Sequence, residues 1–295
     1  MKICRIKAEN MEYFCIYNDG KLYDLSVLLK MEYQKIYDGF YNLYDKITSL
    51  KLDSNAIIKP ESFSYMIPIP GMRSVRDFYS FEDHVKNARK NKGLGMIPEW
   101  YKFPVFYFSC TPNVYPSDSE IKYPEKSSAF DYEMEIAAVI GNTVKDCHKN
   151  CIDSIFGFII MNDWSLRDIQ KEEMKVMLGP AKGKDYATSF GRYLVTRDEI
   201  MLRMEKGKID LDLRAYVNGK LYSSNNLKNI YYSFDQMLER ASESVPLLPG
   251  DVIGSGTFGT GCILELGADK YGWLKKGDNV SLESSVAGEC INRVV

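Results

Sequence analysis

The most informative strand pattern of this 295-residue chain covers residues 130–140 and reads Phe130-Asp131-Tyr132-Glu133-Met134-Glu135-Ile136-Ala137-Ala138-Val139-Ile140. Successive side chains of a β-strand point to opposite faces, so the three acidic residues of this stretch are expected to share one face. The same face continues as Ala137 and Val139. A charged face that becomes apolar along its length predicts a strand that enters the interior of the protein.

The acidic pattern itself has two interpretations. The carboxylates of Glu133 and Glu135 would lie about 6.5 Å apart on one strand face, and they would repel each other by roughly 2–3 kcal/mol at an effective dielectric constant near 20. In open water the repulsion falls below about 1 kcal/mol. The pair is therefore tolerable on a solvated face, which is the favoured interpretation for an isolated pair, and it needs a cation if it is buried.

A second stretch favours the cation. Residues 159–170 run from an apolar strand into polar residues and read Ile159-Ile160-Met161-Asn162-Asp163-Trp164-Ser165-Leu166-Arg167-Asp168-Ile169-Gln170. Asp163 is expected either at the strand end, where ligand sites often lie, or as the N-cap of a following helix. The oxygen atoms of Glu133, Glu135 and Asp163, with water, would suit a hard divalent ion such as Mg²⁺, with Mn²⁺ or Ca²⁺ as alternatives.

The cysteines do not form a clear metal site. The segment Cys147-His148-x-x-Cys151 offers three soft groups without a fourth nearby, so we interpret it as a loop or helix start, with metal binding as the minor alternative. All seven cysteines, at positions 4, 15, 110, 147, 151, 262 and 290, are loosely spaced. Odd number and loose spacing predict reduced thiols in a cytoplasmic protein.

Strand patterns outnumber helical patterns along the rest of the chain, which predicts an α+β fold. We expect strands at Ile3–Lys7, Tyr13–Tyr17, Leu22–Leu25, Phe103–Ser109, Phe156–Met161, Ile209–Val217, Asp251–Ser255, Cys262–Leu266 and Asn279–Glu283, and helices within 26–50, at Phe78–Asn91 and at Phe234–Ala241. Asn218-Gly219 predicts a two-residue hairpin turn. The proline-rich segment Lys59–Pro70 is interpreted as a linker between a small N-terminal region, residues 1–60, and a larger domain, residues 61–295.

Composition excludes several classes of protein. Hydrophobic residues make up 45% and charged residues 26% of the chain, as in globular proteins. The 38 basic and 40 acidic residues give a net charge of −2, so no nucleic-acid partner is expected. The longest nearly apolar run, Ile155–Met161, is far shorter than the roughly 20 residues of a membrane span, so no membrane partner is expected either.

Several motifs, taken together and in order, make residues 60–295 resemble the fumarylacetoacetate hydrolase family. They are Asp77-Phe78-Tyr79-Ser80 with His84, the acidic stretch at residues 130–135, Asn162-Asp163-Trp164-Ser165-x-Arg167-Asp168-Ile169-Gln170, Gly183-Lys184, and Gly256-Thr257 followed by Glu265. The resemblance implies a mixed β-roll or barrel-like domain with a small N-terminal region, and a homodimer.

The resemblance also implies roles for individual residues. Glu133, Glu135 and Asp163 match metal ligands, and Asp77 matches a further ligand in the branch that hydrolyses fumarylacetoacetate. His84 and Glu265 match a pair that activates water. Positions that contact substrate are matched by Tyr79, Tyr107, Gln170, Lys184 and Thr257. The chain departs from the family pattern after Gln170, where Lys171-Glu172-Glu173-Met174 stands in place of a substrate-binding tyrosine.

The chemistry of C–C bond hydrolysis between two carbonyl groups calls for the same residue types. A histidine such as His84 suits the deprotonation of water near neutral pH, and Glu265 can orient it. Lys184 and Gln170 can donate to the oxyanion that forms, and a metal can stabilise the departing enolate. Without the resemblance, a solvated surface histidine and a turn lysine would be the favoured interpretations of His84 and Lys184.

We therefore expect a cytoplasmic, metal-dependent hydrolase that cleaves a C–C bond in an acylpyruvate or related 1,3-diketo acid. One alternative keeps the metal but not the attack by water, and comprises decarboxylation, tautomerisation or isomerisation of a 2-oxo acid. Another is a non-catalytic metal-binding protein. The pairing of His84 with Glu265 separates these alternatives, because a binding protein has no need to activate water.

Overall fold

The computed structural model describes residues 1–91, 93–109 and 111–295, so Cys110, one of the seven cysteines, lies outside the described residues. The main sheet follows the order β4-β3-β2-β1-β14-β12-β11-β19-β6-β7, and β5, β8, β10 and β13 pair with strands along this path. Its strands are β1 (Lys2–Ala8), β2 (Met11–Asn18), β3 (Lys21–Asp24), β4 (Ile57–Ile58), β5 (Ser64–Met66), β6 (Val75–Phe78), β7 (Phe106–Ser109), β8 (Val114–Pro116), β10 (Phe130–Asp131), β11 (Met134–Ile140), β12 (Ile155–Leu166), β13 (Ala187–Phe190), β14 (Leu194–Thr196) and β19 (Val252–Gly254).

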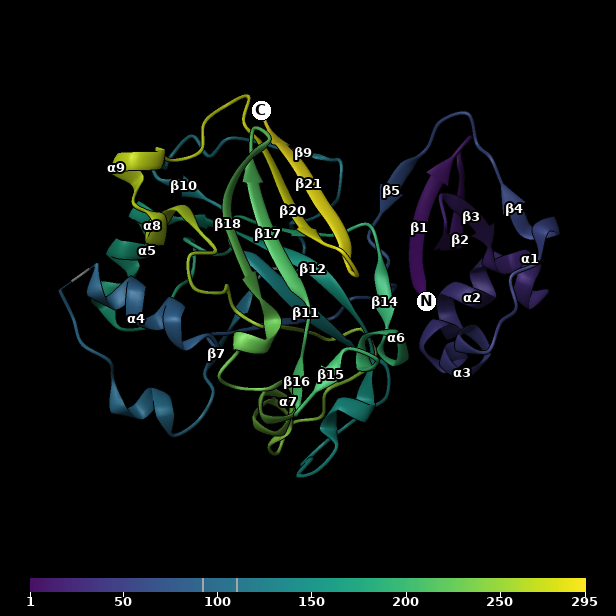
Figure 1. Cartoon of the computed structure of the whole chain (residues 1–295), viewed down its shortest axis with the longest axis horizontal. Coiled ribbons are helices and arrows are strands. Elements are labelled where there is room, and N and C mark those ends of the chain that lie inside the picture. The colour runs from purple at the N-terminus through teal and green to yellow at the C-terminus, as the bar shows by residue number, and fades with distance from the viewer. Residues whose placement is uncertain (92, 110) are drawn as a thin grey trace.

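A second sheet lies against β11 and β12 in Figure 1 and has the order β18-β17-β20-β21-β9. Its strands are β9 (Glu120–Ile121), β17 (Asp212–Val217), β18 (Lys220–Asn226), β20 (Asn279–Ser284) and β21 (Gly288–Val294), and a separate ribbon pairs β15 (Met204–Glu205) with β16 (Lys208–Ile209). The helices are α1 (Leu25–Leu29), α2 (Tyr33–Gly39), α3 (Tyr44–Thr48), α4 (Glu82–Lys90), α5 (Arg167–Glu173), α6 (Arg197–Met201), α7 (Phe234–Ser242), α8 (Ile263–Leu266) and α9 (Ala268–Tyr271). Short 3₁₀ turns are η1 (Phe40–Leu43), η2 (Ser54–Ala56), η3 (Pro98–Tyr101), η4 (Cys151–Ser154), η5 (Met174–Val176) and η6 (Leu227–Asn229).

The centre of the fold is the antiparallel pair of β11 and β12, in which every residue is buried. Alternate residues of β11 pack into two different apolar clusters: Ile136 and Ala138 into the larger one, Ala137 and Val139 into the other. The second cluster also contains the apolar side chains of the N-terminal helices. The expectations of a strand that enters the interior and of an α+β fold are both confirmed.

The N-terminal region is joined to the rest by strand pairing. β1 pairs with β14 through Lys2↔Val195 and Ile3↔Leu194, so the main sheet continues across both parts. β5, which pairs with β1, lies inside the segment that we interpreted as a linker. Figure 1 shows the N-terminal strands and helices grouped at one end of the molecule. The division into residues 1–60 and 61–295 stays a prediction.

Several element boundaries differ from the sequence-based expectations. The strand expected over residues 130–140 is interrupted at Tyr132 and Glu133, and β12 continues through Asp163 to Leu166. The helix expected from Phe78 starts at Glu82, because Phe78 ends β6. The hairpin at Asn218-Gly219 is confirmed, with Val217 opposite Lys220.

The segment Cys262–Leu266 was expected to be a strand and is instead the short helix α8. The reason is a contact with a distant residue. The buried carboxylate of Asp131 accepts hydrogen bonds from the backbone N–H groups of Ile263 and Leu264, at 2.8 and 3.0 Å. These are unsatisfied donors of a helical first turn, and a carboxylate stabilises them.

The expectation of reduced thiols is wrong for Cys147 and Cys151, which form a disulfide. Their Cα atoms are 5.8 Å apart, a usual separation for a disulfide, because Asn150 turns the chain with a positive φ of 54°. Cys4, Cys15, Cys262 and Cys290 are buried free thiols. Within the described part of the chain, no helix combines the length and the apolar character needed to cross a membrane.

Candidate active site

Three acidic side chains from separate strands meet inside the main sheet. Asp77 lies in β6, Glu135 in β11 and Asp163 in β12, and each has an exposed fraction of 1%. One carboxylate oxygen from each lies within 4.8 Å of the others. Among the described residues, Asp77 Oδ1, Glu135 Oε1 and Asp163 Oδ1 have no hydrogen-bond partner. We call Asp77, Glu135 and Asp163 the acid cluster.

The acid cluster is electrostatically unfavourable without a proton or a cation. Burial, and then the nearby charge of Asp163, raises the pKa of Asp77 to about 7. Burial and the charge of Asp77 raise the pKa of Glu135 well above its ordinary value, and burial also raises the pKa of Asp163. Unpaired buried carboxylates are costly, so this arrangement suits a bound cation.

Glu133 lies beside the acid cluster but has cationic partners of its own. Its Oε1 accepts from Arg167 Nη2 at 2.6 Å, and its Oε2 accepts from Lys184 Nζ at 2.6 Å. Although burial opposes it, the charges of Lys184 and Arg167 hold the pKa of Glu133 well below its ordinary value. A carboxylate has about four lone-pair positions, so these contacts leave capacity for a metal ligand.

Lys184 connects Glu133 to the acid cluster. Its ammonium also donates to Asp163 Oδ2 at 2.5 Å and to Ser165 Oγ at 2.6 Å. Although burial opposes it, the carboxylates of Asp163 and Glu133 raise the pKa of Lys184, which keeps the side chain charged. The interpretation of Lys184 as a turn lysine is wrong, because the side chain is buried and carries three polar contacts.

Arg167 contacts the candidate site residues Glu133 and Gln170, and the sequence did not assign it a role. It is buried at the start of α5, and its Nε donates to Asp131 Oδ2 at 2.8 Å. Because Asp131 also holds the first turn of α8, Arg167 links α8 to Glu133. Its position in the polar stretch after a buried strand was the available signal.

Tyr107 contacts the acid cluster directly. Its hydroxyl lies 2.7 Å from Asp77 Oδ2 and makes a short hydrogen bond with Asp163 Oδ2. A phenol has one proton to donate. A proton on Asp77, whose pKa is raised to about 7, would complete the set of bonds without a cation.

The second group of candidate residues is a histidine–glutamate pair. His84 lies in α4 and Glu265 in α8, and His84 Nδ1 is 2.8 Å from Glu265 Oε2. The ring N–H is not aligned with that oxygen, as is common for catalytic hydrogen bonds in ligand-free proteins. His84 is buried and packs edge-on against Tyr79 at 5.1 Å between ring centroids. A solvated surface histidine is therefore excluded.

The remaining predicted residues lie around these two groups. Gln170, in α5, accepts from Arg167 Nη1 at 3.1 Å through its Oε1. Thr257 is buried, and its hydroxyl donates to the backbone carbonyl of Met134 at 2.9 Å. The adjacent Gly256 N–H donates to Glu135 Oε2 at 3.0 Å. The expected contacts of Tyr79, Gln170 and Thr257 with substrate stay predictions.

Gly254 borders the acid cluster, a role that its sequence context did not indicate. A Cβ atom at this position would lie 2.6 Å from Asp77 Oδ1 and 3.1 Å from Glu135 Oε2. Glycine is therefore the residue that leaves room for these carboxylates. The alternating glycines after an apolar strand, Gly254 and Gly256, were the available signal.

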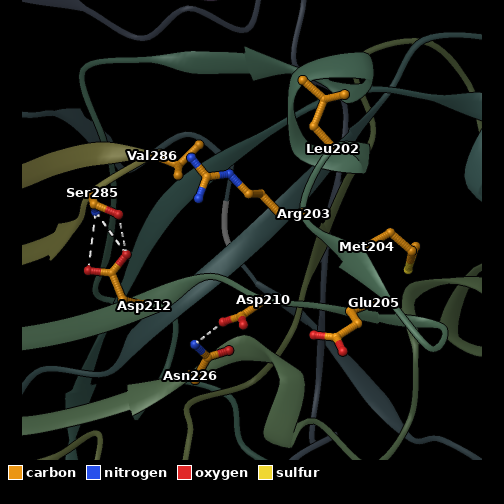
Figure 2. A pocket seen from close by; sticks show the side chains of 9 residues that line it. All are labelled: Leu202, Arg203, Met204, Glu205, Asp210, Asp212, Asn226, Ser285 and Val286. Carbon is orange, nitrogen blue, oxygen red and sulfur yellow. Dashed lines mark hydrogen bonds between the residues drawn. The ribbon is translucent and has the colours of Figure 1, made fainter.

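Figure 2 shows a different hollow, a surface pocket of about 370 Å³. It is lined by Leu202, Arg203, Met204, Glu205, Asp210, Asp212, Asn226, Ser285 and Val286. Its central carboxylates already have partners: Asp212 accepts from Ser285, and Asp210 accepts from Asn226. None of the predicted site residues lines this pocket.

The chain belongs to the fumarylacetoacetate hydrolase family, because the family model described as "Fumarylacetoacetate (FAA) hydrolase C-terminal" matches residues 73–295. A fumarylacetoacetase of Arabidopsis thaliana is 26% identical over 308 residues, which cover 82% of this chain and 73% of the relative. A 2,4-didehydro-3-deoxy-L-rhamnonate hydrolase of Sphingomonas sp. (strain SKA58) is 27% identical over 308 residues, covering 95% and 99%.

Solved structures show the same fold. A fumarylacetoacetate hydrolase from Exiguobacterium antarcticum superposes with a TM-score of 0.76 at 23% identity, covering 100% of this chain and 99% of that one. A fumarylpyruvate hydrolase from Pseudomonas aeruginosa, in complex with Mn²⁺ and pyruvate, superposes with a TM-score of 0.60 at 21% identity, covering 80% and 93%. The resemblance inferred from the sequence motifs is thus confirmed for family and fold.

Proposed function

We propose that this chain is a metal-dependent hydrolase that cleaves a C–C bond in an acylpyruvate or related 1,3-diketo acid. The observation that carries the proposal is the proximity of a buried acid cluster to a buried His84–Glu265 pair. Glu133 connects the two groups. It shares Lys184 with Asp163, and it accepts from Arg167, which also binds Asp131, the residue that holds the first turn of α8.

A divalent cation, Mg²⁺, Mn²⁺ or Ca²⁺, fits the acid cluster. Three buried carboxylate oxygens without partners among the described residues supply the hard ligands that such ions prefer. Asp77, Glu135 and Asp163 would hold the ion, with Glu133 as a further ligand. When bound, the ion would act as a Lewis acid for negative charge on a substrate oxygen. The Mn²⁺ in the fumarylpyruvate hydrolase structure supports this assignment.

The side chains of this protein divide the remaining tasks. His84 would take a proton from water at Nε2, while Glu265 accepts the Nδ1–H and stabilises the imidazolium. Lys184 uses its three N–H groups on Glu133, Asp163 and Ser165, so it would reach a substrate oxyanion by exchanging one of them. The amide N–H₂ of Gln170 is the second donor, since its Oε1 is directed at Arg167.

Partners and location follow from the proposed chemistry. The substrate is a small 2-oxo or diketo acid, and we expect neither nucleic acid nor membrane as a partner. A homodimer in the cytoplasm is proposed from the family resemblance. Four cysteines are free thiols, which agrees with a reducing compartment: Cys4, Cys15, Cys262 and Cys290. The Cys147–Cys151 disulfide is not a feature that a reducing compartment favours.

A turnover panel tests the reaction class. Acylpyruvates and oxaloacetate are incubated with the protein and Mg²⁺ or Mn²⁺, and the products are identified by NMR. The proposal predicts pyruvate plus a second carboxylic acid from an acylpyruvate. Turnover of oxaloacetate alone, with acylpyruvates unchanged, would instead establish the decarboxylase or tautomerase alternative, and no turnover with a bound ion would favour a metal-binding protein.

A further inference from the structure

The Glu265 carboxylate is held by donors from three places in the chain. Its Oε2 accepts the backbone N–H of Thr260 at 3.0 Å and lies 3.7 Å from the Cys262 thiol. Its Oε1 accepts from Asn87 Nδ2 at 3.1 Å. Burial raises the pKa of Cys262 well above its ordinary value, so the thiol keeps its proton and can donate. Among the described residues, Asn87 supplies the side-chain hydrogen bond to Glu265 Oε1.

Asn87 comes from the same helix as the histidine. His84, Asn87 and Asn91 are spaced three and four residues apart, so they share one face of α4 and its C-terminal end. That face packs against α8: Asn91 Nδ2 donates to the carbonyl of Leu264 at 3.2 Å. The preceding loop also approaches α4 closely, since a Cβ atom at Gly259 would lie 2.7 Å from Asp83 Cβ.

Asn87 and Asn91 therefore have different roles. Among the described residues, the Asn91 side chain makes its hydrogen bond to the backbone of α8, which contributes to the docking of the two helices. Asn87 contacts the carboxylate that faces His84. A carboxylate fixed at both oxygens keeps Oε2 2.8 Å from Nδ1, and once the ring and the carboxylate align, an acceptor at Nδ1 selects the imidazole tautomer that carries its proton there. The free Nε2 is then the basic atom.

We infer that Asn87 is a positioning residue that orients Glu265 and thereby sets the tautomer of His84. The catalytic part of this inference rests on the proposed hydrolase function, whereas the tautomer is a property of the protein without substrate. Loss of the Asn87 donor leaves Oε1 without its side-chain partner. The carboxylate can then rotate away from Nδ1, and the neutral imidazole redistributes toward the Nε2–H form, which is the wrong form for a base at Nε2.

The chain allows a clean test because it contains only two histidines, His84 and His148. Protein labelled with ¹⁵N-histidine is studied by NMR at alkaline pH, where the imidazoles are neutral. The variants are Asn87→Ala, and Asn87→Asp, which keeps the size and removes the donor. Asn91→Ala is the matched control on the same helix, and the exposed His148 is the internal reference.

The inference predicts that His84 is mainly in the Nδ1–H form in the wild type and in Asn91→Ala. In both Asn87 variants the Nε2–H form should increase several-fold, while His148 does not change. On a substrate found in the turnover panel, kcat of the Asn87 variants should fall by about 10–100-fold, as for a misplaced catalytic group, with KM within about twofold.

Wild-type tautomer populations in both Asn87 variants would overturn the inference, as would equal effects of Asn91→Ala and Asn87→Ala. These outcomes are distinct from a failure of the hydrolase proposal. If no acylpyruvate is cleaved, the NMR result still decides whether Asn87 sets the tautomer. If His84→Ala abolishes hydrolysis while the Asn87 variants keep the wild-type tautomer, only the inference about Asn87 fails.

Discussion

Gly254 stands directly opposite Asp77 in the parallel pairing of β19 with β6, and this register brings a residue without a side chain against a buried carboxylate. The relationship explains how three acidic side chains fit at the centre of a closely packed sheet. The space that a Cβ atom would take is occupied by Asp77 Oδ1 and Glu135 Oε2. Gly254 thus contributes to the acid cluster because it has no side chain that would collide with Asp77.

Gly254→Ala should weaken metal binding while the fold is kept. The added methyl group would overlap Asp77 Oδ1 and Met161 Cε, each 2.6 Å away, so Asp77 must shift. We therefore expect Mn²⁺ affinity to fall by about 10–100-fold, the range for residues that support metal ligands. Isothermal titration calorimetry measures the affinity, with Gly39→Ala in α2, where an added Cβ has nothing within 4 Å, as the control. Wild-type affinity in Gly254→Ala would show that the acid cluster is not the metal site.

The metal-free protein should lose stability as pH rises. Asp77, with its pKa raised to about 7, binds a proton in the folded state that it releases in the unfolded state above about pH 4. Its contribution to stability is present below the unfolded pKa and is lost as pH rises through about 7. Glu133 has the opposite shift, which acts only in acid.

Thermal unfolding in a chelator should therefore show a melting temperature that falls by several degrees between about pH 5 and about pH 8. Asp77→Asn should make this dependence smaller, because the amide does not titrate, and the raised pKa of Glu135 should account for part of what remains. Mn²⁺ should stabilise the wild type more at the higher pH, where the carboxylates are ready to bind it. The raised pKa of Asp77 would be contradicted if the chelated wild type were more stable at the higher pH and Asp77→Asn showed the same pH dependence.

Lys184→Met should destabilise the protein strongly in the absence of metal. It leaves Glu133 Oε2 and Asp163 Oδ2 buried without their cation, and breaking a buried ion pair costs about 3–5 kcal/mol. Urea unfolding measures the change. Lys175→Met, which breaks an exposed pair with Glu172, is the control and should have little effect. Equal stabilities of the two variants would refute the account of Lys184.

The Cys147–Cys151 disulfide should add a modest amount of stability. The two residues are only 4 apart, and closing so short a loop contributes about 2 kcal/mol in the chain-entropy description. A reducing agent should lower the melting temperature of the wild type but not of Cys147→Ser. Alkylation of both residues in native protein without a reducing agent, detected by mass spectrometry, would show that the bond does not form.

Sequence patterns predicted the features that depend on residues close together in the chain. Periodicity indicated β11 and β12 and the α+β class, and Glu133, Glu135 and Asp163 together pointed to a cation before any relative was considered. Asp77 and His84 acquired roles only through the family resemblance. Their own surroundings in the sequence are equally typical of a surface loop and a surface helix.

The features that sequence reasoning missed depend on contacts between distant segments. Residues Ile263–Leu266 alternate like a strand, and only the carboxylate of Asp131 explains why they form a helix. The space at Gly254 is defined by Asp77 and Glu135, which lie on other strands. The partners of Lys184 likewise come from β12 and from the break between β10 and β11.

In the proposed reaction, water activated by His84 attacks a carbonyl carbon of an acylpyruvate. The most direct measurement is turnover of an acylpyruvate with Mg²⁺ or Mn²⁺ in ¹⁸O-labelled water, with the products analysed by mass spectrometry. One solvent oxygen should appear in the carboxylic acid that is formed together with pyruvate. The rate should fall by about 10²–10⁴-fold in His84→Ala. Products that lack the solvent oxygen, or a rate that His84→Ala leaves unchanged, would contradict it.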